Sequence, residues 1–104
     1  MKIHVAGVTY RPGYPANLHA LRQEHIAAVL PIPITLQREI TNEHDSNAIR
    51  VIHGEQHLGY VPRDKAHALA RALDAGQVFR AHVEKVTDDR AFPALVIVVD
   101  PEES

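Results

Sequence analysis

Five polar side chains that could bind a ligand lie close together in the segment NEHDSNAI, residues 42–49. They are Asn42, His44, Asp45, Ser46 and Asn47. Asn and Asp can accept hydrogen bonds from backbone amides two residues further along, which stiffens a turn between two strands. This structural interpretation suits Asn42 and Asn47 best. His44 and Asp45 are adjacent, so in an extended corner they point in different directions and could contact a ligand from two sides.

Catalytic and metal-binding motifs have little support elsewhere in the chain. Ser46 is the only serine away from the terminus, and there is no G-x-S-x-G motif or Gly-rich phosphate loop, which argues against a serine hydrolase or an ATPase. The absence of cysteine excludes disulfides, thiolate nucleophiles and Cys-based zinc sites. His53 and His57 flank a turn but lack the HExxH spacing. We therefore expect no enzyme activity, no metal and no cofactor.

Length and composition predict one soluble domain spanning residues 1–104. No apolar run approaches the roughly 20 residues that cross a bilayer, and the start MKIHVAGV is typical of a strand rather than a signal peptide. We therefore expect a cytoplasmic protein with no membrane partner. The acidic end, residues 100–104, is expected to be frayed.

The formal net charge of −2 argues against a protein that coats duplex DNA through a general electrostatic surface. Local basic clusters remain compatible with this balance. The chain has eight histidines, which change charge near neutral pH, so binding to an anion could depend on pH.

The first half of the chain predicts a strand, a helix and a second strand. Residues 2–10 alternate like a half-buried strand, and Pro12, Gly13 and Pro15 then indicate a loop. A helix over residues 18–30 follows, with Asn17 as its cap. Pro31 and Pro33 end it, and residues 32–37 form the next strand. The inward stripe of the helix comprises Leu18, Leu21, His25, Ala28 and Val29.

The second half predicts a hairpin, a helix and two further strands. Residues 48–53 and 57–61 are strands joined at Gly54, which supplies the positive φ of a tight turn. The apolar period then changes to that of a helix over residues 64–75, and residues 78–86 and 92–99 again have strand character. Tyr60 is expected to lie in the core.

The predicted order is strand, helix, three strands, helix, two strands. Because a parallel sheet would need a helix in every crossover, this order favours a mainly β fold with two helices (α+β), a small OB-like barrel of about six strands. Gly7 and Gly59 fall within strands and suggest bends or close backbone approaches, which a small barrel needs at its corners.

Three segments resemble successive blocks of the HIRAN domain, a small module found at the N-terminus of certain fork-remodelling DNA translocases and as a free-standing bacterial protein. They are VAGVTY at 5–10, LQREITNEHDSNAIRV at 36–51 and LGYVPRDKAHALARALDAG at 58–76. The core pattern N-x-[YH]-D-x-N-A-[IV] is specific, and the blocks occur in the family order over most of the chain. The resemblance implies an OB-like barrel with helices packed at one end.

The resemblance also implies a pocket for the 3′ end of single-stranded DNA. In the family pattern two aromatic or His side chains stack on the terminal bases and an Asp accepts a hydrogen bond from the free 3′-hydroxyl. Tyr10, His44 and Asp45 occupy these places. Arg63 matches a basic position near the DNA backbone, and Phe92 an aromatic at the far side of the pocket. Arg38 and Asn47 complete the DNA-binding set that we predict, with Arg38 as a weak phosphate candidate that could instead pair at the surface.

Such a pocket would read a chain end rather than a sequence. Every base has a π-face, so stacking tolerates any sequence and is worth about 1–3 kcal/mol per base. An ionised Asp45 would accept a terminal hydroxyl and repel a 3′-phosphate. The expected partners are a 3′ end of single-stranded DNA and a helicase or nuclease acting in trans, in DNA repair or replication-fork processing.

Three positions depart from the family pattern. Glu43 stands where the family often has Pro, His44 where DNA-binding members have Tyr, and Thr9 where an Arg would help to hold phosphate. Together with the acidic balance, these departures favour an alternative, a protein-interaction module that kept the barrel and lost DNA binding. A third candidate is a metal-dependent phosphoesterase that uses His44 and Asp45.

Overall fold

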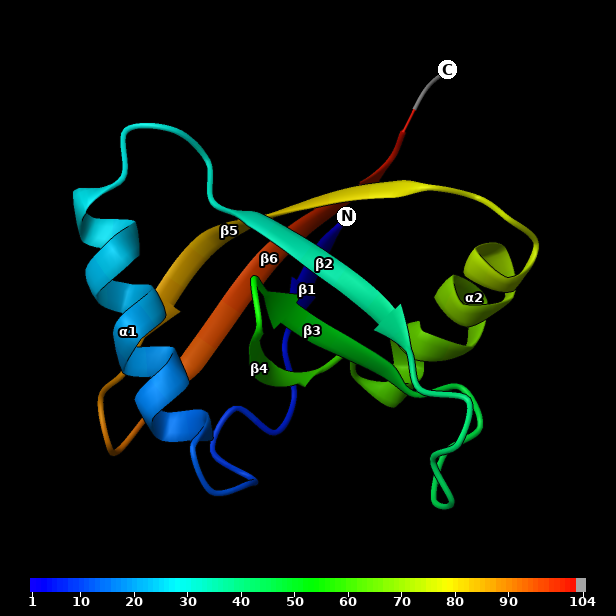
Figure 1. The fold of residues 1–104 in the computed structure, drawn as a ribbon, viewed down its shortest axis with the longest axis horizontal. Coiled ribbons are helices and arrows are strands. Elements are labelled where there is room, and N and C mark those ends of the chain that lie inside the picture. Colours follow the sequence, from blue (N-terminus) through cyan, green and yellow to red (C-terminus); the bar gives the residue numbers. More distant parts are fainter. Residues whose placement is uncertain (103–104) are drawn as a thin grey trace.

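The computed structural model describes residues 1–102, whose elements follow one another in the predicted order (Figure 1). Strand β1 is followed by helix α1, strands β2, β3 and β4, helix α2, and strands β5 and β6. Their bounds are β1 Lys2–His4, α1 Tyr14–Ala27, β2 Pro33–Arg38, β3 Ile49–His53, β4 Gln56–Tyr60, α2 Arg63–Asp74, β5 Phe79–Thr87 and β6 Ala94–Pro101.

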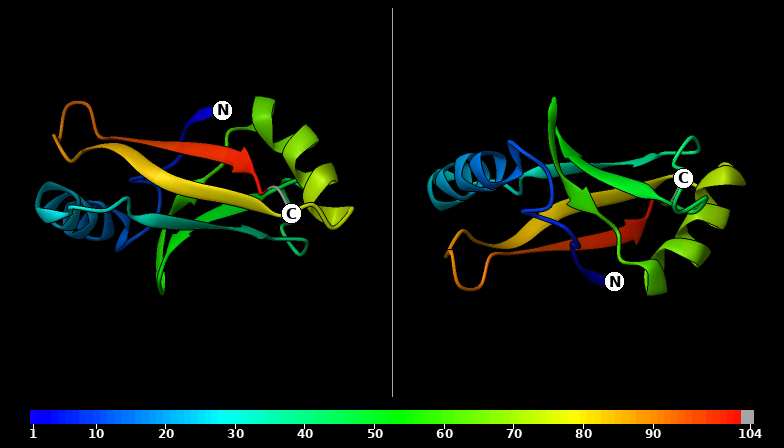
Figure 2. Two further views of the ribbon diagram at one scale, coloured as in Figure 1. Left: turned by 90° about the horizontal axis from the view of Figure 1, so that it is seen from above. Right: turned by 90° about the horizontal axis from the view of Figure 1, so that it is seen from below.

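The strands form one antiparallel sheet in the order β1-β6-β5-β2-β3-β4, which curls into a half-barrel. Strand β2 links the two parts of the sheet, pairing with β5 at Ile34↔Ala81 and with β3 at Leu36↔Val51. The two helices lie at opposite ends of the curled sheet (Figure 2). The prediction of a mainly β, OB-like fold with two helices is confirmed.

The two outer strands of the sheet meet at a single bridge that nearly closes the barrel. Beyond the end of β1, the amide of Ala6 donates to the carbonyl of Tyr60 at 2.8 Å, and the amide of Tyr60 donates back at 2.9 Å. Gly59 makes this approach possible, because a Cβ on it would lie 2.5 Å from the carbonyl oxygen of Ala6. The close backbone approach predicted for Gly59 is therefore present at this seam.

Gly59→Ala is expected to lower the free energy of unfolding by about 2 kcal/mol or more. The added methyl would clash with the backbone of Ala6, which cannot change rotamer as a side chain can. Chemical denaturation monitored by circular dichroism measures the change. Gly54→Ala is the matched control, because Gly54 also has a positive φ, of 61°, but has open space around it. A cost no larger than that of Gly54→Ala would show that the seam does not need a glycine.

The core lies inside the curl of the sheet. Strands contribute fully buried side chains from alternate positions, and α1 and α2 cover the open ends with short apolar stripes. Burial of such side chains is the main stabilising term of a small domain. The largest fully buried side chains are Ile3, Leu18, Leu21, Ile49, Val51, Leu58, Leu95, Ile97 and Val99.

Two predicted boundaries in the first third of the chain were wrong. The first strand stops at His4 rather than at residue 10, since Gly7 has a φ of 70° and its carbonyl accepts the amide of Tyr10 in a turn. Helix α1 starts earlier, with Gly13 as its N-cap and a proline in its first turn, where a missing amide costs nothing. Asn17 is therefore not the cap.

The end of α1 also differs from the prediction. The helix stops at Ala27, so Val29 and the rest of the predicted inward stripe beyond Leu21 are not in the core. Instead of capping the helix, Asn17 ties it to β4 by donating its side-chain amide to the carbonyl of His57 at 2.8 Å.

The first two residues of the end that we expected to fray, Asp100 and Pro101, belong to the sheet. Asp100 lies in β6, and the amide of Glu102 donates to the carbonyl of Val78 at 2.8 Å. Arg80 also bonds the Glu102 carboxylate. Residues 103–104 lie outside the described part. No helix among residues 1–102 combines the length and apolar character needed to span a membrane.

Candidate nucleic-acid interface

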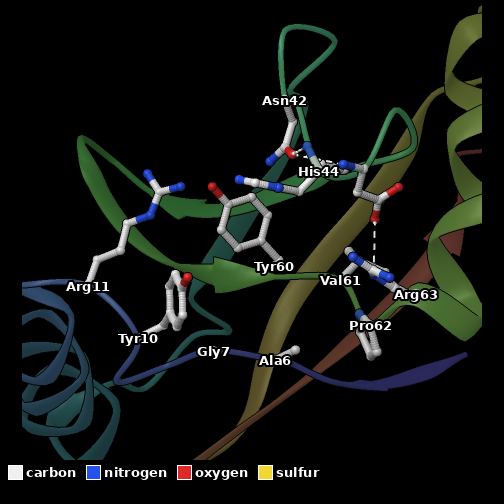
Figure 3. Close-up of a pocket in the computed structure, with 12 residues that line it drawn as sticks. Ala6, Gly7, Tyr10, Arg11, Asn42, His44, Tyr60, Val61, Pro62 and Arg63 are labelled. Carbon is white, nitrogen blue, oxygen red and sulfur yellow. Dashed lines mark hydrogen bonds and ion pairs between the residues drawn. The ribbon is translucent and has the colours of Figure 1, made fainter.

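A cavity of about 480 Å³ lies at the seam where the chain after β1 meets β4 (Figure 3). Three segments that are far apart in the sequence form its walls: the turn after β1, the loop between β2 and β3, and the chain from the end of β4 into α2. Its lining residues are Ala6, Gly7, Tyr10, Arg11, Asn42, His44, Asp45, Ala48, Tyr60, Val61, Pro62 and Arg63.

The cavity combines flat rings with charges of both signs. Tyr10 is 77% exposed, so its ring is available for contact. The guanidinium carbon of Arg11 lies 5.6 Å from the centroid of the Tyr60 ring, within the range of a cation–π contact. On the other side, Arg63 Nε lies 3.9 Å from Asp45 Oδ2. The Arg63 side chain is 80% exposed and thus can turn toward a ligand.

Asn42 holds the loop between β2 and β3 in shape. Its side-chain oxygen accepts the backbone amides of His44 and Asp45, both at 2.9 Å. Asn42 is thus used by the backbone, as the structural interpretation of this segment predicted. The His44 side chain is left exposed at the cavity.

Asp45 divides its carboxylate between the backbone and the cavity. Oδ1 accepts the amide of Asn47 at 2.9 Å, whereas the only contact recorded for Oδ2 among residues 1–102 is the one with Arg63. The side chain is 23% exposed. One oxygen therefore fixes the orientation of the group, and the other is directed to the cavity, where it can accept a further hydrogen bond.

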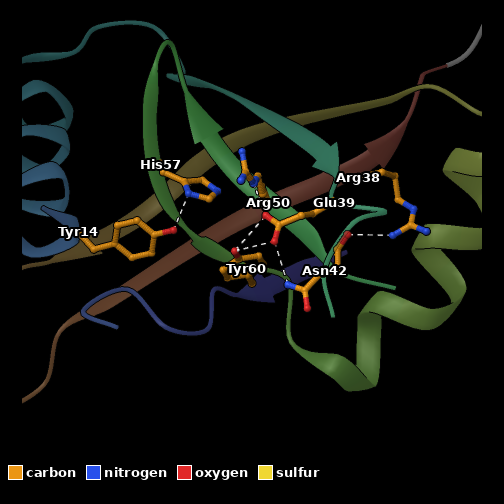
Figure 4. A network of polar contacts seen from close by, with 8 residues as sticks. Tyr14, Arg38, Glu39, Asn42, Arg50, His57 and Tyr60 are labelled. Atoms are coloured by element: carbon orange, nitrogen blue, oxygen red, sulfur yellow. Dashed lines mark hydrogen bonds and ion pairs between the residues drawn. The ribbon is translucent and has the colours of Figure 1, made fainter. Parts of the chain in front are cut away.

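Behind the cavity, Glu39 is the centre of a polar network (Figure 4). Arg50 Nε donates to Glu39 Oε2, Asn42 Nδ2 donates to Oε1 at 2.9 Å, and the Tyr60 hydroxyl donates to Oε2 at 3.1 Å. Burial would raise the pKa of the Glu39 carboxyl, but these hydrogen bonds outweigh it and hold the pKa below its ordinary value. The group is therefore ionised at neutral pH.

His57 supports the other edge of the Tyr60 ring. Its Nδ1 is hydrogen-bonded to the Tyr14 hydroxyl, and the His57 and Tyr60 ring centroids lie 5.6 Å apart in an edge-on arrangement. Nε2 is buried and has no hydrogen-bond partner among residues 1–102. Burial, followed by the positive charges of Arg50 and Arg11, lowers the pKa of His57 below its ordinary value.

His57 should make stability depend on pH. The unfolded chain takes up this proton near pH about 6.5, whereas the folded chain resists it. The contribution of neutral His57 to the free energy of unfolding is therefore complete above that pH. It is lost as the pH falls toward the lower pKa that His57 has in the folded chain. We expect His57→Gln to reduce the difference in free energy of unfolding between pH 7.5 and pH 5.5, as measured by urea denaturation. An unchanged difference would assign the pH dependence to other groups.

Four of the residues predicted from the sequence meet at the cavity: Tyr10, His44, Asp45 and Arg63. Three others lie elsewhere. Phe92 is 79% exposed in the loop between β5 and β6, outside the lining of the cavity. The side-chain nitrogen of Asn47 contacts the ring of His67 at 3.3 Å.

Arg38 is also outside the cavity, and its donors are already used. Its guanidinium bonds Asp74 at 3.0 Å and the carbonyls of Ser46 and Ala48, both at 2.9 Å. Arg38 therefore ties the end of the loop to α2. The ion pair with Asp74 agrees with the alternative in which Arg38 pairs at the surface, and it gives no support to a phosphate contact.

Three aromatic or polar residues of the cavity were not among the predicted DNA-binding residues. The prediction that Tyr60 lies in the core was wrong, because its ring is only half-buried and lines the cavity. Arg11 and Asn42 also line it. Arg11 follows Tyr10 directly and could have been proposed as a phosphate contact from that position. Among residues 1–102, no three His, Asp or Glu side chains are grouped so as to hold a metal ion.

Comparison with known protein families gives a match over most of the chain. The family model of the HIRAN domain matches residues 1–97. The chain belongs to the HIRAN domain family. No curated protein sequence matches it significantly. Membership of this family supports a nucleic-acid-binding module, and domains of this family are typically non-catalytic.

Two solved structures share the fold of this HIRAN domain. A crystal structure of a protein from Lactobacillus plantarum has a TM-score of 0.70 and 26% identity, covering 92% of this chain and 87% of that one. The crystal structure of the HIRAN domain of human HLTF has a TM-score of 0.65 and 24% identity, covering 95% of this chain and 73% of that one.

Proposed function

We propose that this protein is a non-enzymatic module that binds the free 3′ end of single-stranded DNA in the cavity at the barrel seam. The observation that carries the proposal is the position of Asp45, whose Oδ2 is directed to a cavity that also holds exposed aromatic rings and two guanidinium groups. The HIRAN family assignment supports a nucleic-acid partner.

The rings and cations suit a strand of any sequence. Tyr10, His44 and Tyr60 provide flat surfaces on which bases can stack, at about 1–3 kcal/mol per base. Arg11 and Arg63 lie at the same cavity and can contact phosphates of the strand. Arg11 would supply the cation that Thr9 cannot, which compensates for that departure from the family pattern.

Asp45 supplies the preference for a chain end. Its free oxygen can accept a hydrogen bond from a terminal hydroxyl, whereas a 3′-phosphate would bring two negative charges together. Arg63, now beside that oxygen, can turn to the adjacent phosphate because its side chain is mostly exposed. The site would therefore favour a 3′-hydroxyl over a 3′-phosphate.

Fluorescence anisotropy tests the proposal with one labelled oligonucleotide in two forms, ending in a 3′-hydroxyl or in a 3′-phosphate. We expect the hydroxyl form to bind more tightly, and binding to weaken with added salt because phosphate contacts release counterions. A circular strand of the same composition controls for binding to internal nucleotides. Equal binding of both linear forms would contradict end recognition, and no binding to any strand would favour the alternative protein-interaction module.

A module that only binds an end would act together with an enzyme. We therefore extend the proposal to a helicase or nuclease that works in trans during DNA repair or replication-fork processing. Stimulation of such an enzyme by the wild-type protein on a substrate with a free 3′-hydroxyl, and not on one with a 3′-phosphate, is the expected result.

A further inference from the structure

Glu39 does not line the cavity, yet it contacts two residues that do. The Glu39 side chain is 12% exposed, and the residue comes directly after the end of β2. Asn42 belongs to the loop that carries Asp45, and Tyr60 belongs to β4. One largely buried carboxylate therefore connects two of the three walls of the cavity.

The contacts form a short chain from Glu39 to the backbone amide of Asp45. Glu39 Oε1 accepts Asn42 Nδ2 at 2.9 Å, and the other end of the Asn42 amide accepts the backbone amide of Asp45 at 2.9 Å. The amide group of Asn42 thus has a fixed orientation, with its nitrogen toward Glu39 and its oxygen toward the loop. Reversal of this amide would place donor against donor at the loop.

Both oxygens of the Glu39 carboxylate accept hydrogen bonds from neighbouring side chains. Arg50 occupies Oε2, and the Tyr60 hydroxyl lies within 3.3 Å of both oxygens. A neutral amide at position 39 would offer only one acceptor atom to three donors. Since Arg50 is charged, its hydrogen bond takes the acceptor, and the amide nitrogen would then face the nitrogen of Asn42.

We infer that Glu39 is a positioning residue for end recognition: through Asn42 and Tyr60 it sets where the loop that carries Asp45 lies relative to the Tyr60 ring. The inference rests on the proposed function of the cavity. It concerns a residue that makes no contact with DNA itself.

The test exchanges donor and acceptor in the hydrogen bond between residues 39 and 42. Glu39→Gln puts donor against donor, and Asn42→Asp puts carboxylate against carboxylate, so each single variant breaks the link. In the double variant E39Q/N42D the new amide donates to the new carboxylate, which can still accept the backbone amides of His44 and Asp45. The double variant also keeps the net charge of the wild type, so it is matched for long-range attraction to DNA.

Two measurements compare the variants with the wild type. Anisotropy gives the preference for a 3′-hydroxyl over a 3′-phosphate strand, which we expect to fall about fivefold in each single variant and to return in E39Q/N42D. Without DNA, the ¹H–¹⁵N resonances of His44 and Asp45 should shift in E39Q, which leaves the side chain that accepts their amides unchanged. A purely structural role would lower Tm and the active fraction but leave the preference unchanged.

The outcomes separate the two proposals. Resonances that do not move in E39Q would overturn the positioning role whatever the DNA data show. Resonances that follow the expected pattern with an unchanged preference would overturn it as well. A wild-type protein that binds both strand ends equally would instead overturn the proposed function, and the resonances would still report on the Glu39 link.

Discussion

Tyr10→Ala is expected to weaken binding of a 3′-hydroxyl strand by about 10- to 100-fold, the equivalent of one lost base-stacking contact. The side chain is 77% exposed, so its removal takes little from the core, and Tm should not change. Anisotropy and thermal denaturation on the same samples measure the two quantities. A binding loss with an unchanged Tm would identify Tyr10 as a contact residue.

Phe92→Ala is the matched control for that variant. Phe92 is as exposed as Tyr10, at 79%, and the sequence predicted it to contact DNA as well. Because it lies outside the lining of the cavity, we expect its loss to change affinity by less than about twofold, which is the range of surface substitutions. An equal effect of the two variants would show that the strand extends beyond the cavity to the loop between β5 and β6.

Asp45→Asn is expected to remove the preference for a free 3′ end. The amide oxygen can keep the bond to the amide of Asn47, so the loop is retained, and an NH₂ group replaces the oxygen directed to the cavity. Loss of a charge-assisted hydrogen bond should weaken binding of the 3′-hydroxyl strand about tenfold or more. The 3′-phosphate strand should bind better than to the wild type, since the opposing charge is gone.

Glu43→Gln makes the same change of charge on the same loop, at an exposed residue that does not line the cavity. It separates general electrostatics from recognition at Asp45. We expect it to strengthen binding of both strand forms slightly and equally. If Asp45→Asn behaved in the same way, the carboxylate would act only through its charge, and direct acceptance of a terminal hydroxyl would be contradicted.

The order of the elements could be predicted from the sequence because each is encoded locally. The hairpin at Gly54 and the helix after Pro62 follow from turn chemistry and from a change of apolar period within a few residues. The errors fell where local signals compete. Pro15 was taken for part of a loop although proline also suits the first turn of a helix, and Gly7 was taken for strand although its positive φ ends β1.

Four of the predicted site residues line one cavity, and the family motif carries part of their spacing, including His44 and Asp45 in one loop. Tyr60 was assigned to the core because an aromatic residue in a strand is more often buried than not. Its exposure depends on which strand lies beside it. The neighbouring segment is the chain around Ala6, and no local pattern near Ala6 or Tyr60 predicts that the two pair.

By itself, the sequence determined the class of fold, the family and the types of side chain available, since these depend on periodicity and on short motifs. Only the tertiary structure decided which of those side chains share a cavity. Closure of the sheet at Gly59 brings Tyr10 and Tyr60 to one cavity with Asp45, whereas Arg38 pairs with Asp74 of α2 and Phe92 lies outside the cavity. The physical reason is that pairing between distant strands depends on the packing of the whole core, which local sequence does not encode.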